Sequence, residues 1–278
     1  MRILVTNDDG IDSIGLHVLA RAMTRFGHVV IAAPDSEYSG ASAALGAIHL
    51  IRPEVRRTHV DGVPEAWSVS GAPALCVMFA RLGVFGGRFD LVVSGINPGV
   101  NVGRSVYHSG TVGAALTARL GGISGVAVSQ AVTGFGVEGQ GWGEVLQLQR
   151  WDTAATVAEA VVAGLVDGGV PADPVVVNVN VPNLAVDELR GWRRTEIGTV
   201  PPRAMASATL EPKAGHDGAF EVHMQWGDPV LLPPHTDGGA VETGEVSITY
   251  LSRFVGLDLP APTGAERALA DLLGSAGA

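Results

Sequence analysis

The chain has 278 residues, of which 46% are hydrophobic and 17% are charged, and its formal net charge is −10. This composition is too apolar for a disordered chain and favours a folded protein with a sizeable core. Because nucleic-acid binding depends on basic residues that meet phosphates, the acidic balance argues against a nucleic-acid partner. Lys213 is the single lysine, which excludes a phosphate-binding P-loop with its Gly-Lys-Ser/Thr sequence.

Membrane and secretory features are missing from the sequence pattern. No apolar run approaches the roughly 20 residues that a membrane-spanning helix needs. The chain begins directly with a predicted strand instead of a secretory signal, so we expect a cytoplasmic protein without a membrane partner. Cys76 is the single cysteine, which excludes an internal disulfide framework and a Cys-rich zinc site.

Strand and helix patterns alternate along the first two thirds of the chain. The expected elements are a strand at 2–6, a helix at about 15–26, a strand at 29–33, a helix at 72–82, a strand at 90–93, a helix at about 112–119, a strand at 126–129, a helix at 153–166 and a strand at 174–182. This alternation predicts an α/β fold with a mostly parallel sheet and helices on both faces.

The pattern changes after about residue 182, where glycine, proline and short polar–apolar alternations dominate up to about residue 237. We expect this stretch to form a β-rich arm, followed by a strand at 244–251 and a last helix at 265–273. The preferred partition is one domain over 1–278. Its core covers about 1–182, and the arm and a C-terminal segment cover about 183–278.

Three polar loops directly follow predicted strands, at 7–9, 35–42 and 94–111. Ligands of an open parallel sheet bind outside the carboxyl ends of its strands, so these loops can share one site. The first loop contains Asp8 and Asp9, and adjacent carboxylates repel each other unless a cation offsets their charge. The side chains of the three loops offer mainly oxygen donors, which suit a hard divalent ion such as Mg²⁺, Mn²⁺ or Ca²⁺.

Each of these residues also has a purely structural interpretation. "NDDG" is typical of a turn before a helix, and Ser39, Asn97 and Asn101 can be turn residues between glycines. His108 can be structural. Ser109-Gly110-Thr111 can be an ordinary helix N-cap, or it can capture an anion at the helix N-terminus. The residues alone leave both interpretations open.

Six blocks in order carry a resemblance to a known family: "ILVTNDDGIDSIGL", "APDSEYSGAS", "DLVVSGINPGVNVG", "YHSGTVGAAL", "VNVNVP" and "TDGGAVETGEVSITYL". Together they resemble the SurE family of survival-protein nucleotidases, from residue 2 to about 251. The resemblance implies a Rossmann-like α/β fold with a β-hairpin arm and a C-terminal segment used in oligomerisation. It also implies a divalent-metal-dependent phosphatase that acts on nucleoside monophosphates, a 5′/3′-nucleotidase.

The resemblance assigns roles to individual residues. The implied ligands of one divalent ion per subunit, Mg²⁺ or Mn²⁺, are Asp8, Asp9, Ser39 and Asn97, and the two aspartates are also the implied catalytic residues. The implied substrate-facing residues are Asn7, Gly40, Asn101, His108, Ser109, Gly110 and Thr111. Asn7 orients the carboxylates in this interpretation. The implied assembly is a homodimer or homotetramer.

The chain departs from the family pattern at three positions. Leu75 stands where the family commonly has an aspartate, and Arg104 and Ser105 stand where acidic residues are frequent. No departure removes an implied metal ligand. We expect the three departures to affect the rim of the pocket and the substrate preference.

We expect hydrolysis by a metal-activated water, and three rivals remain. A phospho-aspartate phosphatase needs an Asp-x-Asp motif and a downstream lysine. A non-enzymatic phospho-receiver module needs an aspartate after its third strand, where "DLVVSGIN" has a serine. A dinucleotide-binding oxidoreductase is weaker still, because no G-x-G-x-x-G opens the first helix.

Overall fold

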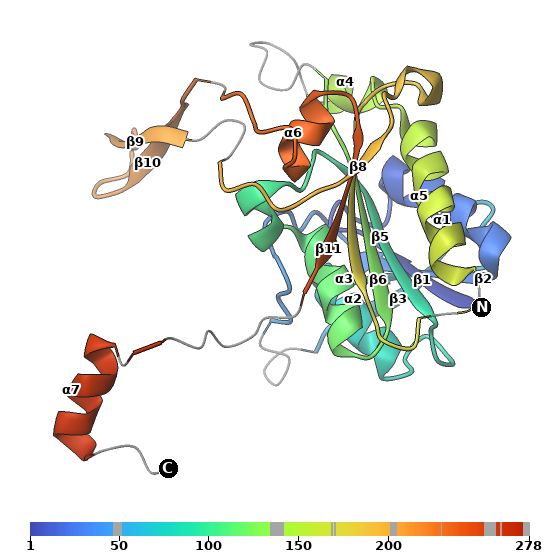
Figure 1. Ribbon diagram of the computed structural model, residues 1–278, viewed down its shortest axis with the longest axis horizontal. Helices are drawn as coiled ribbons and strands as arrows, with labels where there is room; N and C mark the ends of the chain where they lie inside the picture. The colour runs from blue at the N-terminus through green and yellow to red at the C-terminus, as the bar shows by residue number, and fades with distance from the viewer. Residues whose placement is uncertain are drawn as a thin grey trace.

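The computed structural model describes residues 1–46, 52–133, 142–167, 169, 171–200, 205–228, 230–252, 260–261 and 263–274. Its main sheet has nine strands in the order β3-β4-β2-β1-β5-β6-β7-β11-β8 (Figure 1). Their bounds are Arg2–Thr6 (β1), His28–Pro34 (β2), Val55–Thr58 (β3), Glu65–Val69 (β4), Leu91–Pro98 (β5), Ser124–Gln130 (β6), Val176–Val181 (β7), Trp192–Arg194 (β8) and Val246–Leu251 (β11).

The central run of the sheet, from β4 through β2, β1, β5 and β6 to β7, is parallel throughout. β3 is antiparallel to β4, and β11 is antiparallel to β7. β8 then pairs with β11 in parallel. The predicted α/β fold with a mostly parallel sheet is therefore confirmed.

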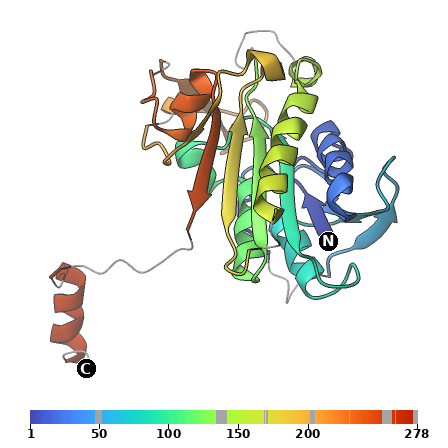
Figure 2. The same cartoon turned by 45° about the vertical axis from the view of Figure 1, so that its right-hand side comes forward.

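Helices cover both faces of this sheet (Figure 2). Their bounds are Ile14–Met23 (α1), Pro73–Arg81 (α2), Gly110–Leu120 (α3), Trp142–Gln147 (α4), Trp151–Val166 (α5), Asp237–Glu242 (α6) and Gly264–Leu273 (α7), with short 3₁₀ helices at Thr24–Phe26, Gly103–Tyr107 and Val186–Glu188. Of the described helices, none is both long and apolar enough to cross a membrane.

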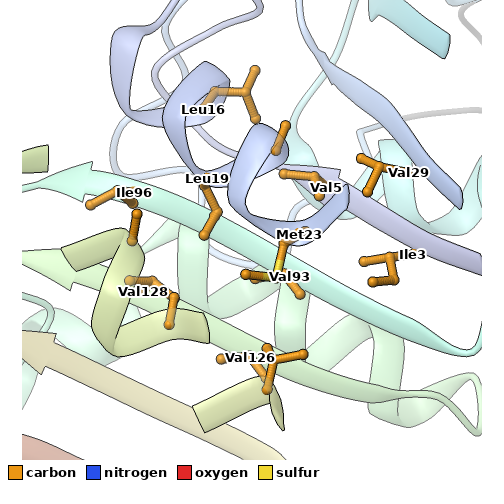
Figure 3. Packing of buried hydrophobic residues seen from close by; sticks show 14 of the residues in the cluster. Ile3, Val5, Leu16, Leu19, Met23, Val29, Val93, Ile96, Val126 and Val128 are labelled. Carbon is orange, nitrogen blue, oxygen red and sulfur yellow. The ribbon is translucent and has the colours of Figure 1, made fainter. Parts of the chain in front are cut away.

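The strand period of two divides the core into two layers. Ile3 and Val5 of β1 pack under α1 and α5, whereas Leu4 joins a second cluster under α2 and α3. Figure 3 shows the α1 side chains Leu16, Leu19 and Met23 over the sheet, and all three are fully buried. Burying each such side chain stabilises the folded protein by roughly 1.5–3 kcal/mol. The two layers therefore fix the position of the sheet and of the loops at its edge.

The strand order reverses between β1 and β5. The chain leaves β1 toward β2 on one side, while β5, β6 and β7 continue on the other. This is the topological switch point of the sheet, where ligands of open α/β folds bind. The loops that follow β1, β2 and β5 all start from this edge, as the sequence predicts.

Some elements differ from the sequence expectation. β5 does not end at residue 93 but continues through Pro98, so the first residues of the expected loop 94–111 are strand. The register against β6 shifts between Ser94 and Asn97. Gly95 makes this path possible, because it has φ of 130° and a Cβ there would lie 2.2 Å from the carbonyl oxygen of Val128.

The expected arm is in part an arm and in part main sheet. Two strands, β9 (Met205–Pro212) and β10 (Phe220–Trp226), form an antiparallel hairpin that projects from the sheet (Figure 1). β8 and β11, in contrast, extend the main sheet from beyond residue 182. α7 has no buried residue and lies apart from the sheet in both views (Figures 1 and 2). The partition into one domain stays a prediction.

Candidate active site

Asp8 follows β1 directly and lies against the start of α3. Its side chain is 3% exposed. The Gly110 amide donates to Oδ2 at 3.1 Å, and the Thr111 hydroxyl donates to Oδ1 at 2.5 Å. A carboxylate at this place is stabilised by the free N–H groups and the dipole of the helix N-terminus. The two contacts therefore fix both oxygens of Asp8 at the switch point.

Asp9 is a second acid in the same turn, and its side chain is half-buried. Burial raises its pKa to about 8, and the negative charges of Asp8 and Glu37 add to the rise. Burial also raises the pKa of Asp8. Asp9 Oδ2 and Asn7 Oδ1 are buried without a hydrogen-bond partner among the described residues. Unpartnered buried oxygens next to two acids are costly for a protein unless a cation binds there.

Asn97 contributes an amide oxygen from the end of β5. Its Nδ2 donates to the Gly99 carbonyl at 2.7 Å, which fixes the orientation of the amide. Its Oδ1 then lies 3.4 Å from the Thr111 hydroxyl, which also contacts Asp8. Thr111 thus joins the two predicted ligands Asp8 and Asn97.

The loop after β2 reaches the same edge of the sheet. The Tyr38 amide donates to the Asp8 carbonyl at 2.7 Å. The next residue, Ser39, is exposed and its hydroxyl donates to Glu37 Oε1 at 2.9 Å. Gly40 is exposed beside it. Ser39 thus follows a residue that contacts Asp8, whereas Asn97 is linked to Asp8 through Thr111. Their role as metal ligands stays a prediction.

The residues before α3 divide between cap and rim. Ser109 is buried, and its hydroxyl accepts a hydrogen bond from the Val112 amide at 3.1 Å, so the N-cap interpretation is confirmed. His108 is exposed at the rim, and its carbonyl accepts from the Ser42 amide at 3.0 Å. Gly110 and Thr111 carry the helix-start groups that face Asp8.

Asn101 is held from the other side of the site. Its side-chain NH₂ donates to Ser129, and its backbone amide donates to Asn180 Oδ1 at 2.7 Å. Asn178 and Asn180 of β7 both donate to its carbonyl. Sequence reasoning missed these two asparagines, although the alternation in "VVNVNV" places them on one face of the strand. The phosphate-facing role of Asn101 stays a prediction.

The three departures from the family pattern lie in different surroundings. Leu75 is buried within α2. Arg104 and Ser105 are exposed in the 3₁₀ helix after Asn101, and the Ser105 hydroxyl contacts the Val102 backbone. Arg104 and Ser105 are thus surface residues of the loop, whereas Leu75 is part of the interior.

Gly110→Ala tests the close approach of Asp8 to α3. A Cβ at Gly110 would lie 2.8 Å from both Cβ and Oδ2 of Asp8. The acid must move, so we expect the free energy of unfolding in urea to fall by about 1–3 kcal/mol. Gly164→Ala is the matched control, because a Cβ there meets nothing within 4 Å and a helical Gly→Ala change stabilises by roughly 0.5–1 kcal/mol. Equal stability of the two variants would contradict the packing described here.

Comparison with known proteins shows which family the chain resembles. The sequence profile of the family described as Survival protein SurE matches residues 3–203. A protein of Xanthomonas axonopodis pv. citri named 5′-nucleotidase SurE is 36% identical over 269 residues, which cover 93% of each chain. A protein of the same name from Xylella fastidiosa is 37% identical over 254 residues, which cover 90% of this chain and 88% of the relative.

A solved structure extends the likeness to three dimensions. The crystal structure of the SurE protein from Aquifex aeolicus superposes with a TM-score of 0.70 at 30% sequence identity. The match covers 98% of this chain and 99% of that one. With the sequence profile and the two relatives, this agreement in fold shows that the chain belongs to the survival protein SurE family, several of whose members are named 5′-nucleotidases.

Proposed function

We propose that this protein is a divalent-metal-dependent phosphatase that hydrolyses nucleoside monophosphates to nucleoside and phosphate. The observation that carries the proposal is the adjacent pair of a buried Asp8 and a half-buried Asp9 at the switch point, with Asp8 held against the N-terminus of α3. The relatives named 5′-nucleotidase match over about nine tenths of the chain and support the choice of substrate class.

The residues present fit a hard divalent ion. The donors are two carboxylates, an amide oxygen and a hydroxyl, from Asp8, Asp9, Asn97 and Ser39, and such oxygen donors suit Mg²⁺ or Mn²⁺. Asp9 Oδ2 is a buried oxygen that has no hydrogen-bond partner in the described part of the chain, and a cation would satisfy it. Within the described part of the chain, no group of three or more His, Cys, Asp or Glu side chains suits a metal, so the hydroxyl and amide are needed to complete this set.

The chain's own groups then have distinct tasks. A bound divalent ion supplies polarisation of the phosphoryl group and lowers the pKa of a water molecule. The Gly110 amide and the Thr111 hydroxyl hold Asp8 in place at the N-terminus of α3. Proton transfer falls to one aspartate of the pair or to His108, which is exposed at the same rim.

The rival mechanisms gain no support from the structure. Lys213 directly follows β9 on the projecting hairpin, and its ammonium lies 3.9 Å from Glu221 of β10. A phospho-aspartate phosphatase or a receiver module needs its lysine beside the acid pair. At the receiver's phosphorylation position β5 carries Ser94, which is buried.

A metal-by-substrate panel tests the proposed function. Protein stripped with chelator is expected to release no phosphate, and added Mg²⁺ or Mn²⁺ is expected to restore release from 5′- or 3′-nucleoside monophosphates, whereas Ca²⁺ restores less. The measurement is colorimetric phosphate release with each ion and each substrate. Full activity in chelator would contradict the metal role, and a phosphorylated Asp8 trapped during turnover would favour the phospho-aspartate rival.

The remaining expectations are part of the same proposal. The substrate is a small molecule rather than a nucleic acid or a membrane, the assembly is a homodimer or homotetramer, and the location is cytoplasmic. The acidic net charge of −10 supports the first of these, because an acidic protein lacks the basic residues that bind the phosphates of nucleic acids.

A further inference from the structure

Asp237 is a buried acid outside the proposed metal site, and its side chain is 1% exposed. Its carboxylate accepts three backbone hydrogen bonds, each 2.9 Å long. The Gly103 amide donates to Oδ2, and the Gly198 and Gly238 amides donate to Oδ1. Burial of a charge is costly, and three amide donors are what stabilise it here.

A cap for α6 does not account for this carboxylate. Thr236 already caps the helix, since its hydroxyl accepts from the Gly239 amide at 3.2 Å. A carboxylate in the first helical turn does favour the helix dipole. That effect requires no contact with Gly103, which lies 134 residues earlier in the chain. The contact therefore serves the loop at Gly103 rather than the helix.

Gly103 belongs to the loop that joins Asn97 of the proposed site to the start of α3. Its φ is 54°, and a Cβ there would lie 3.0 Å from the Gly198 carbonyl oxygen. Gly198 lies on the segment that leads toward the hairpin β9–β10. One carboxylate thus joins the loop, the segment before the hairpin and the start of α6.

The loop is fixed at three further places. Asn101 is bonded to β6 and β7, the His108 carbonyl accepts from Ser42, and Ser109 caps α3. Between Gly103 and Ser109 the loop presents the exposed side chains of Arg104, Tyr107 and His108. The segment leads directly into Gly110 and Thr111, which contact Asp8, so the position of Gly103 affects where these exposed side chains stand relative to the acid pair.

We propose that Asp237 is a positioning residue that holds the loop from residue 99 to 109 in the place where the substrate binds. The role rests on the proposed function. It acts through Gly103 and not through the metal ligands, so it should govern substrate affinity and leave ion binding and the chemical step intact.

Asp237→Asn cuts the contact to Gly103 selectively. The asparagine oxygen can keep the two donors at the Oδ1 position, Gly198 and Gly238. Its NH₂ group then faces the Gly103 amide, so that a donor meets a donor. We expect KM for a nucleoside 5′-monophosphate to rise about tenfold. The kcat and the Kd for Mn²⁺ should each change less than about threefold, because neither depends on this contact.

The experiment measures KM, kcat, the Mn²⁺ Kd by calorimetry, and amide hydrogen exchange of the loop. Asp187→Asn is the matched control, because Asp187 is an exposed aspartate for which the structure gives no side-chain partner among the described residues. Faster exchange in the loop together with the KM rise would support the role. If Asp237→Asn does not fold, Gly103→Ala strains the same contact from the loop side and carries the same expectation.

Three results would overturn the role. An active wild type with an unchanged KM in Asp237→Asn removes it and leaves the proposed function standing. A parallel loss of kcat, ion affinity and melting temperature shows a general structural part instead. A wild type that releases no phosphate from the whole panel removes the proposed function, and this role with it.

Discussion

Asp8→Asn is expected to lower kcat/KM for nucleoside monophosphate hydrolysis by about 10³-fold or more at saturating Mn²⁺. The change removes a charge that would hold the ion. It also places an amide NH₂ where Asp8 now accepts from the Gly110 amide or the Thr111 hydroxyl. The ion and the N-terminus of α3 would therefore both lose the Asp8 carboxylate as a binding partner. Steady-state kinetics and calorimetric Mn²⁺ titration measure the two losses.

Asp12→Asn is the control for this change. Asp12 is exposed and lies a few residues further along the same turn. Its substitution by asparagine removes the same formal charge from the chain as Asp8→Asn does. We expect its kcat/KM to stay within about twofold of wild type, since exposed charges at this distance are screened. Asp8→Asn with wild-type activity would contradict the proposed metal site.

Asp9→Asn is expected to stabilise the metal-free protein at alkaline pH while it weakens ion binding. Burial raises the pKa of Asp9 from 3.8 to about 8 in the folded state. Between these two values the unfolded chain has lost a proton that the folded protein retains, so the free energy of unfolding falls as the pH rises from about 4 to about 8. Asparagine cannot ionise, and the variant escapes this loss.

Urea unfolding in chelator from pH 4 to pH 9 measures the difference. We expect Asp9→Asn to exceed wild type by on the order of 3 kcal/mol at pH 9. The pKa of Asp8 is also raised by burial, and to a first approximation its contribution is common to both proteins. Saturating Mn²⁺ should reverse the order, because the ion binds the folded wild type. If the free energies of unfolding of the two proteins changed in parallel with pH, the raised pKa of Asp9 would be contradicted.

Much of the fold is predictable because local patterns and tertiary packing agree. The helix period at Leu16 and Leu19 and the apolar run of β1 read correctly, since each buries one face against the other. β3 is different. Its sequence "VRRT" is mostly exposed at the sheet edge, so it lacks an apolar alternation and forms only because β4 supplies hydrogen-bond partners. α6 is likewise not predicted from the sequence, because its two glycines lower the helix propensity of the segment.

The site shows the same division. The placement of Asp8 and Asp9 after β1 and of Asn97 at the end of β5 is predictable because the carboxyl ends of parallel strands meet at one edge. The sequence predicts that Thr111 faces the substrate, and its contact with Asp8 becomes visible only when α3 is placed beside β1. Asp237 gives no local signal at all, because its partner Gly103 is remote in sequence. Contacts between residues so far apart in the sequence depend on the topology of the fold rather than on the sequence pattern around either residue.

The insertion of β11 between β7 and β8 has a consequence for synthesis. A chain emerges from the ribosome with its N-terminus first, so β7 is complete before the hairpin and β11 have been made. During that interval the outer edge of β7 presents unpaired N–H and C=O groups to other nascent chains. A chain that stops before Val246 would therefore keep an open edge and become prone to aggregate, even though every strand from β1 to β7 is present.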